Sequence, residues 1–250
     1  MPTNIPFIDF CNHKGYTVAP DARILDFGCG AGAFVYKLID AGYPNAEGYD
    51  VKDRPLELRD PADKSRFYID PEGHIPVPDE TYDFIFSSQV FEHVQDQRAA
   101  FIEILRVLKP GGVNVNVFPG NWRIIEPHTM VPLGGIVMFR TRLWFRLWAA
   151  LGIRNGFQKG MSATEVTDRN HAYVHDSVNY LSLRQYRQVL SDLPMKWSWE
   201  EFDYRLAGGG RRAQLGKRFP VILALSRLSI GMGRAMQSRV LVMRKNPTPK

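Results

Sequence analysis

The 250-residue sequence contains little cysteine and no long apolar run. Its two cysteines are Cys11 and Cys29, and Cys29 lies inside a glycine-rich stretch. A disulfide framework is therefore not expected, and a reducing compartment fits better. No window of about 20 residues is both apolar and free of charge, so no membrane-spanning helix is expected. The first ten residues lack the basic segment followed by an apolar one that is typical of a signal peptide. These absences favour a cytoplasmic globular protein.

Acidic residues are missing from the end of the chain. Eleven basic residues follow Asp203 and none that is acidic. Residues 1–120 carry 11 Lys or Arg and 18 Asp or Glu, whereas residues 121–250 carry 21 and 8, so the net charge of +6 hides an acidic half and a basic half. The basic half is expected to meet a phosphorylated substrate, an anionic membrane or a nucleic acid, unless it is simply a solvated surface.

Strand-like and helix-like segments alternate in the first half. Short apolar runs bounded by turn residues predict strands, and apolar residues at helical spacing predict helices over 31–42 and 98–112. The predicted strands cover residues 23–28, 46–51, 65–70, 82–88 and 113–118. This order predicts an α/β fold with a parallel, doubly wound sheet.

The sequence changes character after Phe118. Residues 119–135 are rich in proline and glycine and predict a long loop, and residues 154–176 look polar and irregular. An amphipathic helix is expected over 139–152, with Arg142 and Arg146 four positions apart. Nearer the C-terminus, a helix is expected over 182–193, where Ser182 and Gln185 have capping-box spacing. Strands are expected over 195–204 and 239–245, with a basic, helix-like stretch between them.

The stretch ILDFGCGAGAF, residues 24–34, ends a strand in glycines and reopens as a helix. Gly28, Gly30 and Ala33 fit the loose dinucleotide fingerprint, but Asp26 would repel a pyrophosphate and could instead accept from an ammonium group. A further glycine, Gly32, follows. Asp50 ends the second strand, where a carboxylate can accept both ribose hydroxyls, as it also does in dinucleotide sites. The loop thus favours an amino-acid-bearing cofactor over a dinucleotide.

Two later motifs, FYIDPEGHIPVPDETYDFIFSSQVFEHV and LRVLKPGGVNVNVFP, follow at suitable distances. With them, residues 20–120 resemble the class I S-adenosylmethionine-dependent methyltransferases, in particular the small-molecule branch of quinone biosynthesis with its type 11/12 domain. The resemblance implies S-adenosyl-L-methionine as cofactor. It also implies a Rossmann-like, mostly parallel sheet with an antiparallel last strand and a helical insertion after strand 5.

The same resemblance assigns roles to residues at the strand ends. The methionine zwitterion would lie against Asp26 and the amides of the glycine loop, although Asp26 could also be an N-cap. Ser87, Ser88 and Gln89 would end the fourth strand beneath the cofactor. The remaining matches are Asp50 for the ribose hydroxyls, Val51 against the adenine, Asp70 for the adenine amino group, and the Glu92-His93 pair that opens the next helix. Asp70 could equally be a turn residue, and His93 could simply pack or cap a helix.

An oxygen acceptor must lose a proton during methyl transfer. The candidate bases are His128 and His93, and Glu126 could orient His128; the alternative is a loop histidine bonded to a nearby carbonyl. His171 and His175 are four apart and could share a metal, but no third ligand is near them in sequence, so no metal is predicted.

The sequence therefore predicts one methyltransferase domain over 1–250. Residues 20–120 would bind the cofactor, 120–176 would form an insertion or lid over the acceptor site, and 205–237 would be a basic helical insertion. The favoured acceptor is an oxygen of a small-molecule, glycan or lipid-linked compound. The aromatic and arginine-rich segment 139–151 favours contact with an anionic membrane at the inner face, whereas a nucleic-acid partner lacks a binding signature.

Two other readings stay open. One is a catalytically inactive protein that binds the cofactor or a partner. The other is an NAD-dependent oxidoreductase, which the ordered motifs disfavour.

Overall fold

The computed structural model describes residues 5–207 and 238–247. At its centre is a seven-stranded sheet of order β3-β2-β1-β4-β5-β7-β6. The strands are β1 (Ile24–Phe27), β2 (Ala46–Asp50), β3 (Phe67–Ile69), β4 (Tyr82–Ser88), β5 (Leu108–Pro119), β6 (Met195–Trp199) and β7 (Ser238–Lys245). Strands β1 to β5 pair in parallel, and β7 runs antiparallel to both β5 and β6. The predicted Rossmann-like sheet with an antiparallel last strand is confirmed.

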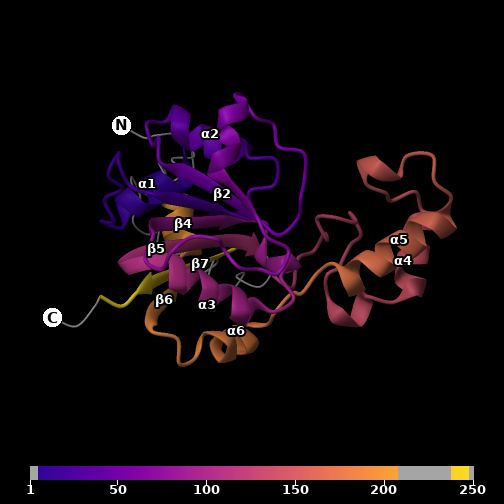
Figure 1. The fold of residues 1–250 in the computed structure, drawn as a ribbon. Coiled ribbons are helices and arrows are strands. Elements are labelled where there is room, and N and C mark those ends of the chain that lie inside the picture. The colour runs from indigo at the N-terminus through magenta and orange to yellow at the C-terminus, as the bar shows by residue number, and fades with distance from the viewer. Residues whose placement is uncertain (1–4, 208–237, 248–250) are drawn as a thin grey trace.

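Helices cover both faces of this sheet (Figure 1). On one face, α1 (Pro6–His13) and α2 (Ala33–Asp40) contribute to one apolar core, and α7 (Glu201–Ala207) packs on α1. On the other face, α3 (Gln97–Val107) and α6 (Leu183–Leu190) close a second core. The capping box of Ser182 and Gln185 opens α6 as predicted. None of the helices in the described part of the chain has the length and apolarity needed to cross a membrane.

The third helix shows why the elements begin and end where they do. Asp96 caps α3 by accepting from the Ala99 amide at 2.9 Å, and Phe101, Ile104 and Leu105 bury one face. The helix ends at Val107, just before the Pro-Gly-Gly at 110–112 that was predicted to end it. Leu108 already has extended backbone and pairs with Tyr82 as the first residue of β5, and the proline at 110 could not continue the helix.

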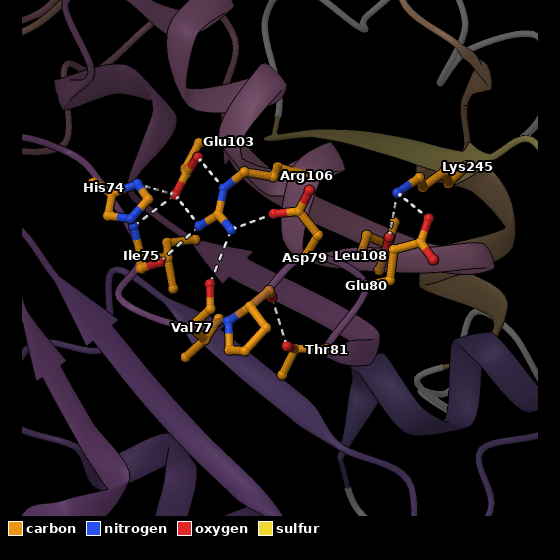
Figure 2. Close-up of polar contacts among 11 residues, drawn as sticks. His74, Ile75, Val77, Asp79, Glu80, Thr81, Glu103, Arg106, Leu108 and Lys245 are labelled. Atoms are coloured by element: carbon orange, nitrogen blue, oxygen red, sulfur yellow. Dashed lines mark hydrogen bonds and ion pairs between the residues drawn. The ribbon is translucent and has the colours of Figure 1, made fainter.

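Arg106, near the end of α3, holds the loop between β3 and β4 in place through hydrogen bonds and ion pairs (Figure 2). Its guanidinium donates to the Ile75 and Val77 carbonyls and to the carboxylates of Asp79 and Glu103, all within 2.9 Å. Glu103 in turn accepts from the Ile75 amide at 2.7 Å. The loop that follows Asp70 is therefore held by ionised groups as well as by the burial of Ile75 in the second core.

A helical unit projects beyond one end of the sheet (Figure 1). It contains α4 (Arg142–Ala150) and α5 (Ala163–Asp176), with short turns of 3₁₀ helix η3 (Val137–Phe139) and η4 (Gly156–Gln158). Four fully buried apolar side chains give it a small core separate from those of the sheet: Val131, Phe145, Val174 and Val178. We call residues 137–176 the lid.

Two predictions for the second half are wrong. Residues 154–176 were expected to be irregular, but α5 fills most of this range and begins at a capping box of Ser162 and Glu165. This helix packs on a small core, so its apolar stripe is too narrow to stand out in sequence. The strand predicted over 195–204 ends at Trp199, and α7 begins at Glu201. The basic helical insertion expected over 205–237 lies almost entirely outside the described residues.

Candidate active site

The glycine loop joins β1 to α2 at the carboxyl end of the parallel strands. The amides of Gly28 and Cys29 donate to the Tyr49 carbonyl at 2.7 and 3.0 Å, and Gly32 donates to the Cys29 carbonyl. Gly28, Gly30 and Gly32 all have positive φ, of 81°, 55° and 88°. The loop therefore has a left-handed backbone that glycine adopts with little strain.

The three glycines differ in what surrounds them. A Cβ on Gly28 would lie 2.3 Å from Val90, and one on Gly32 would lie 2.7 Å from the Phe67 ring. A Cβ on Gly30 would meet nothing within 4 Å. Gly28 and Gly32 are thus required by close packing, whereas Gly30 borders open space where a ligand can approach the backbone.

Asp26 is a buried carboxylate on β1 with no hydrogen bond or ion pair to any described residue; only 5% of it is exposed. Burial raises the pKa of Asp26 to about 7, and the nearby Asp50 carboxylate adds to the rise. Such a group is costly to keep unless a cation or donor pairs with it. This is the environment expected for a carboxylate that receives an ammonium group.

Asp50 ends β2 as predicted and braces the loop. Its Oδ2 accepts from the Gly30 amide and its Oδ1 from the Lys52 amide, both at 2.9 Å. The neighbouring Val51 is 42% exposed. Asp70 lies one strand further out, where its amide donates to the Asp50 carbonyl at 3.2 Å. Its side chain accepts from the Glu72 amide at 2.8 Å, so Asp70 also stabilises the turn that follows β3.

Ser87 and Gln89 differ in burial: Ser87 is buried in the sheet, whereas Gln89 is exposed. The Ser87 hydroxyl is buried and donates to Asn116 at 2.8 Å, so it belongs to a polar ladder inside the sheet. Asn116 extends that ladder by donating to Asn114 at 2.5 Å. Gln89 is exposed and has a φ of 58°, a strained conformation for a residue other than glycine. Gln89 therefore borders the cofactor end of the sheet, whereas the Ser87 side chain is used in the core.

A buried Glu126 and a half-buried His128 form a pair in the loop after β5. Glu126 accepts from the His128 ring Nδ1 at 2.9 Å, from the Thr129 amide at 2.5 Å and from the Tyr180 hydroxyl at 3.0 Å. Burial alone would raise the pKa of Glu126, but hydrogen bonds from His128 and Thr129 outweigh it and hold that pKa below its usual value. The ionised carboxylate thus fixes the Nδ1–H tautomer of His128 and leaves Nε2 as the free acceptor.

His93 lies beside His128, although 34 residues separate them in sequence. The two ring centroids are 5.1 Å apart, with an interplanar angle of 69°. His93 follows β4 in the turn η2 (Phe91–His93), and its Nδ1 donates to the Ser177 carbonyl at 2.7 Å. Burial lowers the pKa of His93 below its usual value. On both histidines the hydrogen bond of the ring is made by Nδ1, so Nε2 is the ring nitrogen left for a further partner.

Glu92 completes this group, and sequence reasoning assigned it no role of its own. It is 1% exposed, and neither carboxylate oxygen has a hydrogen-bond partner within residues 5–207 and 238–247. Burial raises the pKa of Glu92 to about 7. Tyr173 and Tyr180 were also missed; the Tyr173 ring lies 5.2 Å from that of His128. No local motif marks these tyrosines, because the lid and the chain after it bring them to the site.

The predicted residues therefore form two groups. The cofactor candidates cluster at the ends of β1, β2 and β4, and the two histidines meet beside the base of the lid. An open hollow of about 420 Å³ lies on the loop that carries Glu126 and His128, lined by Arg123, Ile124, Ile125, Pro127 and Met130. His171 and His175 lie together on α5, with ring centroids 4.5 Å apart. The prediction of no metal stays untested.

The comparisons agree with this arrangement. Residues 25–115 match the family model described as a methyltransferase domain. The malonyl-[acyl-carrier protein] O-methyltransferase of Methylococcus capsulatus is 35% identical over 99 residues, which cover 37% of this chain and 36% of that protein. The ubiquinone biosynthesis O-methyltransferase of Hydrogenovibrio crunogenus is 30% identical over 117 residues, 44% and 46% of the two chains. The chain thus spans less than half the length of these curated relatives.

A solved S-adenosylmethionine-dependent methyltransferase from Mesorhizobium loti has the same fold. Its TM-score is 0.53 at 15% identity, over 94% of this chain and 96% of that one. The chain carries a methyltransferase domain. Within it, residues 25–115 are similar to S-adenosylmethionine-dependent methyltransferases of class I, and S-adenosylmethionine is the cofactor.

Proposed function

We propose that this chain transfers the methyl group of S-adenosylmethionine to an oxygen of a small-molecule or lipid-linked acceptor. The observation that carries the proposal is the pair of histidines beside the cofactor end of the sheet. Each holds its Nδ1–H in a hydrogen bond to an oxygen and keeps a free Nε2. A neutral imidazole oriented in this way is a suitable proton acceptor for a hydroxyl group.

The cofactor would be held by the residues around the glycine loop. Asp26 fits the ammonium group because its carboxylate is buried without a partner. The open space beside Gly30 fits the approach of the methionine end, and Asp50 and Val51 suit the ribose and adenine. Asp70 and Gln89 would complete the site, with Asp70 near the adenine. Ser87 would contribute through its backbone, because its hydroxyl is committed to Asn116.

In the reaction, the acceptor oxygen forms a bond to the methyl carbon as the bond from that carbon to sulfur breaks. The proton of the hydroxyl passes to Nε2 of His128 or His93, and Glu126 stabilises the positive charge that His128 gains. Alignment of the reactants lowers the barrier by about 7–11 kcal/mol. A general base accelerates the reaction by a factor of about 10²–10⁴, which corresponds to about 3–5 kcal/mol, so alignment contributes more. The chain's main task is therefore to orient the acceptor and exclude water, for which residues 120–176 are the proposed acceptor-site insertion.

The acceptor is proposed to have an apolar part. The hollow on the loop that carries His128 is lined by Arg123, Pro127 and three exposed apolar side chains, Ile124, Ile125 and Met130. One relative, from Synechocystis, is a 2-methyl-6-phytyl-1,4-hydroquinone methyltransferase, 33% identical over 104 residues. A lipid-like or quinone-like acceptor suits such a surface better than a purely polar one, and a glycan would need to carry a lipid.

The outer face of α4 supports a peripheral position at an anionic membrane. Leu143 and Leu151 are 79% and 65% exposed, and Leu147 is 47% exposed. Arg142 and Arg146 are exposed on the same helix. Apolar side chains flanked by arginines are typical of helices that lie in the lipid interface, where each cation contributes about 1 kcal/mol.

Calorimetry and mass spectrometry test the reaction. We expect S-adenosylmethionine to bind and NAD not to bind, and a product heavier by one methyl group to form from at least one acceptor in a panel of phenols, quinols and lipid-linked hydroxyls. Binding of NAD alone would establish the oxidoreductase alternative. Cofactor binding without turnover of any acceptor would support the inactive, cofactor-binding alternative.

Sedimentation with vesicles tests the membrane position. The protein is expected to sediment with phosphatidylglycerol vesicles at low salt and much less at high salt, because screening shortens the reach of each charge. Replacing Arg142 and Arg146 with Gln should abolish sedimentation. The matched control replaces Arg184 and Arg187, two exposed arginines of α6, and should have little effect.

A further inference from the structure

Three potential metal ligands meet where η2 contacts the loop after β5. Glu92, His93 and His128 each offer one ligand atom, and these atoms lie within 4.8 Å of one another. Two ligands come from the end of β4 and the third from the loop that follows β5. No short sequence motif therefore reveals the group, which we call the Glu92 cluster.

All three members of the Glu92 cluster present hydrogen-bond acceptors. Ser177 and Glu126 already occupy the Nδ1 atoms of His93 and His128, so Nε2 is the nitrogen left on each ring. Both oxygens of Glu92 are buried and receive no hydrogen bond from the described residues. The two histidines are less buried than Glu92, but three acceptors this close together around a buried carboxylate leave a deficit of positive charge that a cation can satisfy.

The surroundings of the two histidines match those of metal ligands. A histidine that binds a metal usually donates its other ring N–H to a carboxylate or a backbone carbonyl, which fixes the tautomer and the ring. His128 has the carboxylate of Glu126 in this place, and His93 has the carbonyl of Ser177. The pair of His171 and His175 on α5 has no third ligand near it among the described residues and is not in such a group.

We propose that Glu92, His93 and His128 bind a divalent transition-metal ion of the Zn²⁺ type. Two imidazoles and one carboxylate suit zinc or iron rather than magnesium, which prefers oxygen ligands. Ligands of a tetrahedral zinc ion lie about 3.4 Å apart, so atoms now within 4.8 Å of one another would approach by up to about 1.4 Å. Three protein ligands leave a fourth position open, as in catalytic rather than structural sites.

This inference deepens the proposed function and depends on it only for its consequence. The open position would receive the acceptor hydroxyl, whose pKa a bound metal lowers. The Nε2 lone pairs that would bind the ion are the same ones that would accept the proton of the acceptor. A histidine that binds the metal therefore cannot act as the base at the same time. The metal route needs both histidines as ligands, whereas the base route needs only the one that takes the proton. Metal binding itself can be measured without any acceptor.

Equilibrium dialysis of untagged protein against ZnCl₂, followed by elemental analysis, tests the site. We expect one equivalent of zinc per chain. Glu92→Gln, which preserves shape, and His93→Ala and His128→Ala should each weaken binding at least tenfold. Glu126→Gln, which alters the partner of a ligand, should weaken it about 10- to 100-fold. The matched control, His171→Ala, should bind zinc as the unaltered protein does.

Several outcomes would overturn the metal site. They are uptake well below one equivalent at saturating zinc, unchanged binding in Glu92→Gln, or loss of binding in the His171→Ala control. Calorimetry with S-adenosylmethionine in the presence of EDTA is run on every variant. Failure of the cofactor to bind the unaltered protein there would refute the proposed function, whatever the zinc result. Full methyl transfer in EDTA without zinc uptake would refute the metal alone.

Discussion

Residues 24–89 and residues 119–180 build their sites in opposite ways. The first region shapes the cofactor end with backbone: three glycines of positive φ and amides that donate to Tyr49 and Asp50. The second region shapes the acceptor side with side chains that reach far along the chain, such as Tyr180 to Glu126 across 54 positions and His93 to Ser177 across 84. A cofactor site that is built from local backbone can be predicted from the sequence, whereas an acceptor site that is built from side chains distant in sequence cannot.

The largest expected effect is on the acceptor side. His128→Ala should lower turnover by about 10²-fold or more, because it removes the group that helps the acceptor ionise. The affinity for S-adenosylmethionine should not change, since His128 lies outside the cofactor group. Steady-state kinetics and calorimetry on the same preparation check both points, with His171→Ala as control. Full activity of His128→Ala at neutral pH would end the proposed role.

The next effect is on the cofactor side. Asp50→Ala should weaken S-adenosylmethionine binding at least about tenfold, because a hydrogen bond to a charged acceptor contributes about 1.5–3 kcal/mol. Asp50→Asn keeps an oxygen for the Gly30 amide but loses the charge, so it separates bracing of the loop from binding of the ribose. The control is Asp53→Ala, which removes an exposed carboxylate three positions after Asp50, in the segment that follows β2. Unchanged affinity in Asp50→Ala would contradict the assignment.

A third effect, of similar size, comes from pH. The pKa of Asp26 is raised to about 7, so this carboxyl is mostly protonated below pH 7 and ionised above it. An ammonium group favours the ionised form, so cofactor affinity should rise with pH through 7 and then level off. Binding at pH 6 should be about tenfold weaker than at pH 8. Calorimetry across this range checks the trend.

Asp26→Asn is the matched variant for the pH dependence. It should bind the cofactor weakly and with no rise between pH 6 and 8. Its thermal stability without cofactor should be equal or higher at pH 8, because the change removes a buried charge that has no partner. A pH rise that persists in Asp26→Asn would assign the titration to another group.

The smallest effect on stability belongs to the outer face of the lid. Replacing Leu143 and Leu147 with Ser should change the free energy of unfolding by no more than about 0.5 kcal/mol each, because both side chains are exposed. The same change should abolish sedimentation with anionic vesicles. Phe145→Ala, on the buried face of the same helix, should instead cost about 3–5 kcal/mol. A large loss of stability in the leucine variant would mean that the leucines pack within the protein.

The same contrast explains how far the sequence could be read. Strands β1 to β4 were predicted within two residues, because each is a short run bounded by turn or polar residues, whereas β5 begins at Leu108, five residues before the predicted start. Asp26, Gly28 and Asp50 were singled out because each follows or ends such a strand. The dual role of Asp70 and the burial of the Ser87 hydroxyl depend on neighbours that only the folded sheet supplies.

The acceptor side resisted prediction for a physical reason. Helix α5 packs on a core of four buried side chains, so few of its positions need to be apolar. The Glu92 cluster joins residues from two strand ends, and Tyr173 and Tyr180 arrive from the lid and the chain that follows it. Contacts between residues this far apart cannot be predicted from their spacing along the sequence. Only Glu126 and His128, two positions apart, were paired in advance.

The strand order also has a consequence for biosynthesis. The edge strand β6 joins the sheet only through β7, and β7 pairs with β5 across more than 110 positions, from Phe118 to Arg239. Closing a chain loop of that length costs entropy that local pairing does not. As the chain leaves the ribosome, β1 to β5 can assemble first, and the lid can form its own small core while β5 still has an open edge. We expect β7 to be the step that makes folding cooperative, since it seals β5 and recruits β6 at once.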